Sequence, residues 1–298
     1  MIRIKRIQAF PIVNGIIILM LSFIFLFPFW RVLMMSLNDP IDLGRGGINF
    51  LPRVFSLENY INIFHNPTIG SAYKITISRT VLGTLLHVIM CSLMAFSLSR
   101  DHFKPRKIIN VMLIITMFFN GGLVPTFLLY RQLGLVNNFW IYIIPAIYGT
   151  GSVFILRAGF RTLPKELINE CPKLDGASDL IIFFRIALPL SLPMLATITL
   201  FTAVGHWNDY MTAVLFIQNR DLVPMQTVLY RMLTTLEVFR QMQLSGARVT
   251  MSMTNMVQQT PQSIKMTTII ITAMPIIMVY PFLQRYFIKG IFIGSIKG

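Results

Sequence analysis

The sequence has few charged residues, and acidic residues are the scarcest of them. Only 12% of its 298 residues are Asp, Glu, Lys or Arg, against about 25% in ordinary soluble domains, and 55% are hydrophobic. This composition argues against a soluble globular domain and predicts a protein whose main solvent is lipid. The formal charge of +15 could suggest a nucleic-acid partner. Its Lys and Arg residues, however, lie between apolar runs and form no basic face with interleaved aromatics, so we expect no nucleic acid.

Cysteine is also scarce, and no cleavable leader is evident. The two cysteines, Cys91 in an apolar run and Cys171 in a charged loop, form no disulfide framework and no metal-ligand spacing. The N-terminus begins like a signal peptide, with basic residues before an apolar run. That run continues over residues 10–29 without a small-residue cleavage site, so it is interpreted as a retained first membrane span.

Long apolar stretches recur along the chain. A hydrocarbon core about 30 Å thick needs about 20 helical residues, and backbone polar groups in lipid require helices there. Stretches of this kind predict an all-α polytopic membrane protein with six transmembrane helices. These lie at residues 10–37, 72–98, 108–130, 139–156, 186–206 and 267–287.

Basic residues predict the orientation of these spans. Six spans place the four short basic segments on one side of the membrane, which the positive-inside tendency identifies as the cytoplasm, with both termini inside. The predicted organisation is a cytoplasmic stub with the first helix (1–37), an extracellular loop (38–71) and a core (72–298) that holds a cytoplasmic loop (161–185) and a long extracellular segment (207–265).

Two further absences bear on the source of energy. The proposed spans contain no Asp or Glu, which secondary carriers commonly use as proton or ion partners inside the membrane. The chain also has no GxxxxGK[ST] loop to cradle nucleotide phosphates. A transporter of this composition is therefore expected to take its energy from a separate ATPase polypeptide.

The cytoplasmic loop 161–185 carries the most specific pattern. Pro164 fits a first helical turn, Asp175-Gly176 supplies a break where a left-handed residue is tolerated, and Ser178 can cap a second helix. The loop resembles the Glu-Ala-Ala loop of the permease subunits of type I ATP-binding-cassette importers. The positions that match its spacing are Glu170, Gly176, Ile186, Leu188 and Pro189. Cys171 and Pro172 depart from the family's small alanines, and Pro172 would kink or shorten the first helix.

The resemblance implies a mechanism and a set of partners. In that family the loop is a coupling helix that docks on the ATPase, so Glu170 would face basic groups there, while Asp175, Gly176 and Ala177 form the turn. The family's core has five helices, which leaves the first span peripheral. The implied partners are a second homologous permease, two ATPase copies that hold ATP and Mg²⁺, and an extracellular solute-binding protein, which part of segment 211–265 would contact. This chain would be a transport subunit in the bacterial plasma membrane, with no enzymatic activity and no cofactor or metal of its own.

Other segments resemble the carbohydrate subgroup of these permeases. They are residues 95–100, 207–210 and 284–298, together with 117–126, which resembles oligosaccharide permeases of Gram-positive bacteria. Asn120 lies in Asn120-Gly121-Gly122 before Pro125, where a broken helix would line a cavity or permit close helix packing. Trp207, Asn208, Asp209 and Tyr210 suit a sugar's C–H face and hydroxyls, or form an interfacial belt.

Three alternatives to sugar import by an ATP-driven permease remain open. Two are other transporters, and the third is a membrane enzyme. A permease of the same type could carry amino acids, peptides or ions, and an ion-gradient-driven carrier would need no ATPase. A membrane enzyme would require a nucleophile with its base, or a metal cluster, on a shared helix face, and neither is apparent.

Overall fold

The computed structural model describes residues 9–43, 50–164, 176–244 and 262–295. Named elements in these ranges are all helical, and the only β pairing described there is an isolated bridge between Asn38 and Phe55. The predicted all-α class is thereby confirmed. The chain divides into two compact units, residues 1–67 with 231–274 and residues 68–230 with 275–298. Each unit is described by itself.

The first unit is built around the end of a long apolar helix. It contains α1 (Ala9–Ser36), α2 (Pro40–Leu43) and α3 (Glu58–His65), with parts of α13 (Met225–Leu244) and α15 (Gln262–Ser295). The buried amide of Asn59 donates to the carbonyl oxygens of Ser36 at 3.1 Å and Asn38 at 2.8 Å. These bonds satisfy carbonyls at the end of α1 and hold α3 beside them.

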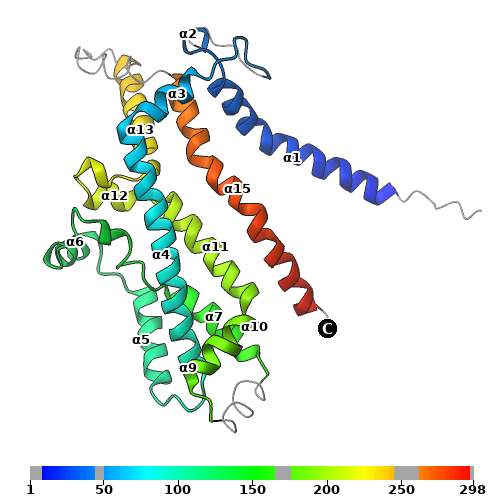
Figure 1. Cartoon of the computed structure of the whole chain (residues 1–298), viewed down its shortest axis with the longest axis vertical. Helices are drawn as coiled ribbons and strands as arrows, with labels where there is room; N and C mark the ends of the chain where they lie inside the picture. The colour runs from blue at the N-terminus through cyan, green and yellow to red at the C-terminus, as the bar shows by residue number, and fades with distance from the viewer. Residues whose placement is uncertain (1–8, 44–49, 165–175, 245–261, 296–298) are drawn as a thin grey trace, which may run out of the picture. The chain divides into compact units, whose positions relative to one another are not determined.

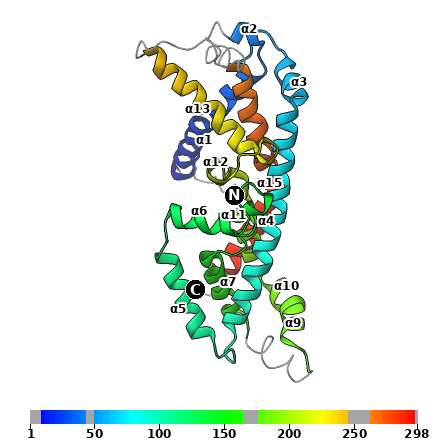
Figure 2. The same ribbon diagram turned by 90° about the vertical axis from the view of Figure 1, so that its left-hand side faces the viewer.

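The second unit is arranged along α4 (Pro67–Ser99), a 33-residue helix. Figures 1 and 2 show α5 and α7 beside one end of α4, and α6 running across the direction of α5. The remaining elements are α5 (Arg106–Phe118), α6 (Leu123–Gln132), η1 (Phe139–Tyr142), α7 (Thr150–Thr162), α9 (Asp179–Ile182), the π-helical turn η3 (Phe183–Ala187), α10 (Leu188–Leu190), α11 (Leu192–Asn208), α12 (Met211–Phe216) and η4 (Arg220–Leu222).

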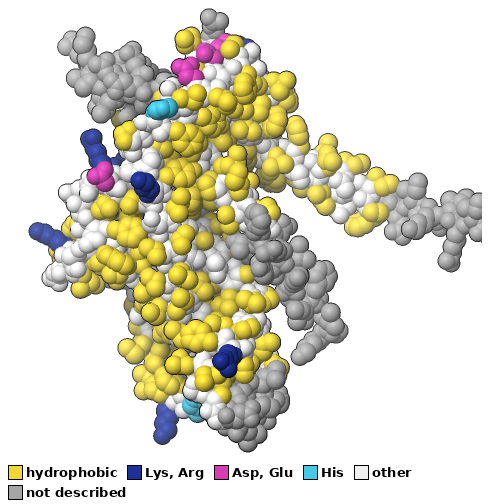
Figure 3. All heavy atoms as spheres, viewed as in Figure 1, with side chains coloured by type: hydrophobic (Ala, Val, Ile, Leu, Met, Phe, Trp, Pro, Cys, Tyr) yellow, Lys and Arg dark blue, Asp and Glu magenta, His cyan; other side chains and the backbone are white. Residues whose placement is uncertain are grey.

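Three predicted spans are confirmed as long helices. Within the described residues, Phe10–Ser36, Pro67–Ser99 and Gln262–Val279 are long and apolar enough to cross a membrane, and up to five crossings result if two bent helix pairs each count as one. Hydrophobic side chains are spread widely over the surface visible in Figure 3, and many large ones, including those of α1 and α5, are exposed, as expected where helices face lipid. The predicted number of six continuous spans is therefore not reached in the part of the chain that the structure describes.

The predicted span 108–130 is broken where the glycines suggested. Helix α5 ends at Phe118 and α6 begins at Leu123, with a bend of 118° between them. Gly122 adopts φ +87°, which a residue with a side chain rarely adopts, and Pro125 falls in the first turn of α6, where its missing N–H costs little.

The prediction of one helix over 139–156 is wrong. Only the short helix η1 and the second half, within α7, are helical, and residues 143–149 are irregular. Asn138 accepts a hydrogen bond from the backbone N–H of Trp140 at 3.2 Å, and Pro145 cannot supply the N–H that a continuous helix would need. The carbonyl of Ala146 is instead bonded to His87 at 2.7 Å.

The predicted span 186–206 is a bent pair of helices. The segments Asp179–Leu190 and Leu192–Asn208 meet at 83° around Ser191. Pro189 has no N–H to bond four residues back to Arg185, which fits the π-helical turn η3, and Pro193 occupies the first turn of α11.

Candidate coupling site and substrate pocket

An aromatic cluster fixes the helices at the loop-bearing end of α4. The ring centroid of Phe96 lies 5.3 Å from that of Phe183 in η3 and 5.7 Å from that of Phe160 in α7. All three side chains are buried, together with Ile182 and Ala187. The segment that follows the predicted coupling loop is therefore packed firmly against α4 and α7.

The turn into this segment has the predicted local structure. Gly176 adopts φ +72°, the left-handed conformation expected at Asp175-Gly176. The Ser178 hydroxyl accepts a hydrogen bond from the backbone N–H of Ile181 at 3.4 Å, which confirms Ser178 as the N-cap of α9.

The structure places the predicted coupling residues in three groups. Ala177, Ile186 and Leu188 are half-buried against the core that contains the aromatic cluster, whereas Gly176 and Pro189 are exposed. Glu170 and Asp175, with Cys171 and Pro172, lie outside the described residues. The half-buried members thus anchor the segment, and their role toward an ATPase stays a prediction.

Arg100 joins the end of α4 to the start of α9. Its Nη2 lies 2.9 Å from the Asp179 carboxylate, its side chain is 3% exposed, and its guanidinium lies 5.2 Å from the centroid of the Phe96 ring. His102 contacts the other Asp179 oxygen at 3.1 Å. The sequence did not predict this pair, because the two residues are 79 positions apart and no local spacing signals the contact.

Arg79, within α4, forms a second ion pair of a buried arginine. Its fully buried guanidinium lies 3.3 Å from the Asp209 carboxylate, also donates to the Asp209 carbonyl, and lies 5.0 Å from the Tyr142 ring centroid. The other carboxylate oxygen of Asp209 accepts the backbone N–H of Thr212 at 3.1 Å and so caps α12. Asp209 thus connects α4 with the end of α11.

A pocket of about 500 Å³ opens beside Asp209. It is lined by His87, Ile141, Tyr142, Pro145, Ala146, Tyr148, Ser152, Phe201, Thr202, Gly205, His206, Asp209 and Thr212. Hydroxyls, imidazoles and aromatic faces together are groups that can bind sugar hydroxyls and C–H surfaces. His87 is held in place at 3.0 Å from the Ser152 hydroxyl. His206 packs so closely on α4 that a Cβ on Gly83 would lie 2.5 Å from its Nε2.

The predicted pathway residues do not form one surface. Of the five, only Asp209 lines this pocket. Trp207 is buried with its ring 6.3 Å from that of Tyr73, and Tyr210 stacks on Tyr230 at 4.5 Å. Asn208 is exposed, and Asn120 lies exposed in the α5–α6 break, where its side chain accepts the Gly122 N–H at 3.0 Å. Their place in a substrate pathway stays a prediction.

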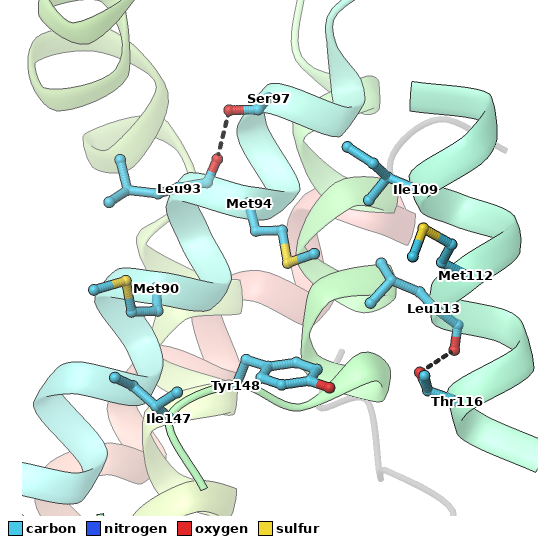
Figure 4. A pocket seen from close by; sticks show the side chains of 10 residues that line it. All are labelled: Met90, Leu93, Met94, Ser97, Ile109, Met112, Leu113, Thr116, Ile147 and Tyr148. Atoms are coloured by element: carbon cyan, nitrogen blue, oxygen red, sulfur yellow. Dashed lines mark hydrogen bonds between the residues drawn. The ribbon is translucent and has the colours of Figure 1, made fainter. Parts of the chain in front are cut away.

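A second pocket, of about 740 Å³, has a different chemistry. Figure 4 shows side chains from α4 and α5 facing one another across it, with Ile147 and Tyr148 at one end. The hydroxyls of Ser97 and Thr116 are already bonded to carbonyls of their own helices, those of Leu93 and Leu113. This apolar pocket therefore offers few groups to a sugar.

Among the described residues, no group of three or more His, Cys, Asp or Glu side chains could hold a metal ion. Cys91 is a buried free thiol.

Comparison with known proteins identifies relatives across almost the whole chain. Residues 84–293 match the family described as binding-protein-dependent transport system inner membrane component. The chain is 36% identical to the polygalacturonan/rhamnogalacturonan transport system permease protein YtcP of Bacillus subtilis (strain 168), over 94% of this chain and 96% of that protein. It is 30% identical to the melibiose/raffinose/stachyose import permease protein MelC of the same organism, over 91% of each.

A solved structure extends this similarity to the fold. It is the crystal structure of a bacterial ABC transporter involved in the import of the acidic polysaccharide alginate. One of its chains superimposes with a TM-score of 0.82 at 26% identity, covering 96% of this chain and 99% of that chain.

Proposed function

This chain belongs to the family of binding-protein-dependent transport system inner membrane components, and from that membership we propose that it is a permease subunit of an ATP-driven oligosaccharide importer. The observation that carries the proposal is the near full-length similarity to permeases named for polygalacturonan and rhamnogalacturonan and for melibiose, raffinose and stachyose. The long apolar helices support a place in the bacterial plasma membrane. In this role the chain moves substrate and catalyses no reaction itself.

The proposed partners follow from the family's name and from the resemblance of the coupling loop. They are a second homologous permease, two ATPase copies that hold ATP and Mg²⁺, and an extracellular solute-binding protein. We assign the ATPase contact to the loop that contains Glu170 and Asp175. The left-handed Gly176 and the capped α9, whose Ile182 is buried in the core, support this assignment, because a coupling element must be held in a defined geometry.

The pocket beside Asp209 is the proposed place where the substrate meets this subunit. Its hydroxyl, imidazole and aromatic side chains support binding of a polar, ring-shaped solute. Asn120, Trp207, Asn208 and Tyr210 remain proposed pathway residues outside this pocket, and part of segment 211–265 is the proposed contact for the solute-binding protein. ATP-driven closure of the ATPases then shifts the pocket between inward-facing and outward-facing states, which differ in substrate affinity.

Transport in proteoliposomes tests the proposal. The complete complex, reconstituted with its binding protein, should take up labelled galacturonan or raffinose-type oligosaccharides only when hydrolysable ATP is present. A non-hydrolysable ATP analogue is the matched control and should support no uptake. Uptake that survives without ATP and collapses with an ionophore would instead identify a gradient-driven carrier, and uptake of amino acids or peptides in place of sugars would overturn the substrate class.

A further inference from the structure

Two ion pairs join α4 to the two ends of a single partner segment. Arg100, just past the end of α4, pairs with Asp179, the first residue of α9. Arg79, within α4, pairs with Asp209, the residue that follows the last turn of α11. The segment between the two aspartates is the bent α9–α11, so α4 holds this segment at its beginning and at its end.

The spacing of the two arginines matches the thickness of a bilayer. Arg100 follows Arg79 by 21 residues, which at 1.5 Å per residue is about 32 Å, close to the hydrocarbon thickness of about 30 Å. Helix α4 is continuous over this distance and contains no proline there. The segment α9–α11 covers a similar path with a π-helical turn and an 83° bend. Of the two connections, α4 is therefore the stiffer one.

Each arginine is also fixed by its surroundings. The side chains of Arg79 and Arg100 are 0% and 3% exposed, and each lies over an aromatic ring, that of Tyr142 or Phe96. The ion-pair partners of these arginines, Asp209 and Asp179, are 33% and 49% exposed, so each pair joins a buried arginine, whose charge would be uncompensated without it, to a partly exposed carboxylate. The nearby pair of Arg106 and Asp101 differs, because its side chains are 25% and 68% exposed and its partners are only five residues apart in the sequence. An exposed local pair contributes little.

We propose that α4 is a strut that carries movement of the coupling loop to the pocket, with Arg100 and Arg79 as the positioning residues at its two joints. Movement enters at Asp179, three residues after Gly176, and reaches Asp209 in the pocket wall. The segment α9–α11 also connects Asp179 to Asp209, but its 83° bend around Ser191 can flex, so less of the displacement at Asp179 would reach Asp209 along it. The inference rests on the proposed function, because it requires an ATPase at the coupling loop.

If movement passes through both ion pairs one after the other, the effects of breaking them should not be additive. Mutations more than about 10 Å apart normally have additive effects, so two independent structural defects at these joints would multiply their losses. If both joints serve one transmitting element, breaking the first already uncouples the pocket, and breaking the second adds little.

The experiment measures sugar taken up per ATP hydrolysed by the complete complex in proteoliposomes. Asp179→Asn removes the charge at one joint, and Arg79→Lys keeps the charge at the other but loses the two-pronged contact with Asp209. Each variant should lower the ratio about tenfold, within the range of allosteric coupling, and the double variant should be no worse than the poorer single one. Basal ATP hydrolysis of Asp179→Asn should be unchanged. Asp209→Glu, which displaces the carboxylate by one methylene, takes the place of Arg79→Lys if that variant does not assemble.

Two controls make the result specific. Asp101→Asn removes the exposed pair near Arg100 and should leave the ratio unchanged, and Asp179→Glu should restore most of what Asp179→Asn loses. Unchanged ratios in both single variants, or losses that multiply in the double variant, would overturn the strut while native ATP-driven uptake still stands. Absence of ATP-driven uptake in the native complex would overturn the proposed function and the strut together.

Discussion

Replacing Asp209 by Asn will lower the free energy of unfolding by about 3–5 kcal/mol, the cost typical of removing one partner from a buried ion pair. The Arg79 side chain is fully buried, so its charge cannot turn to water when the carboxylate is lost. An asparagine at 209 can still accept the Thr212 N–H through its oxygen, so the cap of α12 is retained and the effect reports on the charge. Thermal or denaturant unfolding of the purified chain in mild detergent measures the difference.

Asp101→Asn is the matched control, because Asp101 is 68% exposed and its pair with Arg106 should contribute about 0–1 kcal/mol. Adding Arg79→Met to Asp209→Asn should recover part of the lost stability, since it removes the uncompensated charge. Equal unfolding midpoints for Asp209→Asn, Asp101→Asn and the native chain would contradict a stabilising role for the Arg79–Asp209 pair.

Replacing Gly176 by Val will reduce ATP-dependent uptake by about 5- to 30-fold. A β-branched residue in the left-handed region costs about 1–2 kcal/mol or more, which lowers the population of the turn that presents the coupling loop by the same factor. Among the described residues no atom lies within 4 Å of a Cβ added to Gly176, so we attribute the expected loss to the backbone conformation. Uptake at limiting ATPase concentration is the measurement.

Gly151 provides the control, because an added Cβ there also meets nothing within 4 Å but its φ is not positive. Gly151→Val should therefore transport close to the native rate. Gly176→Asn should retain most activity, since Asn tolerates the left-handed conformation better than other residues with side chains. If Val and Asn at 176 behaved alike, backbone conformation at this turn would not control coupling.

Features with a local chemical signal were predictable from the sequence. Helices α1, α4 and α15 contain apolar stretches long enough to cross a membrane, which the sequence shows directly. The two glycines Gly121 and Gly122, followed by Pro125, mark the break between α5 and α6. Gly176 and Ser178 follow from the residue types that left-handed turns and N-caps select.

Features that depend on distant contacts were not predictable. Hydropathy averages over residues 139–156 hid the irregular segment that begins after Tyr142, where Pro145 lacks the N–H that a continuous helix would need. Arg79 and Asp209 are separated by 130 residues, and no periodicity relates them. The pocket is built from three separate stretches of chain, at residues 87, 141–152 and 201–212, and of its lining only Asp209 was among the predicted pathway residues.

Co-purification of the ATPase with this chain in mild detergent is the most direct measurement of the central claim. The native chain, expressed with its partner permease, should retain the ATPase, and a Glu170→Ala variant that still inserts in the membrane should lose it. Recovery of no ATPase with the native chain, or full recovery with Glu170→Ala, would contradict an ATP-driven permease coupled through this loop.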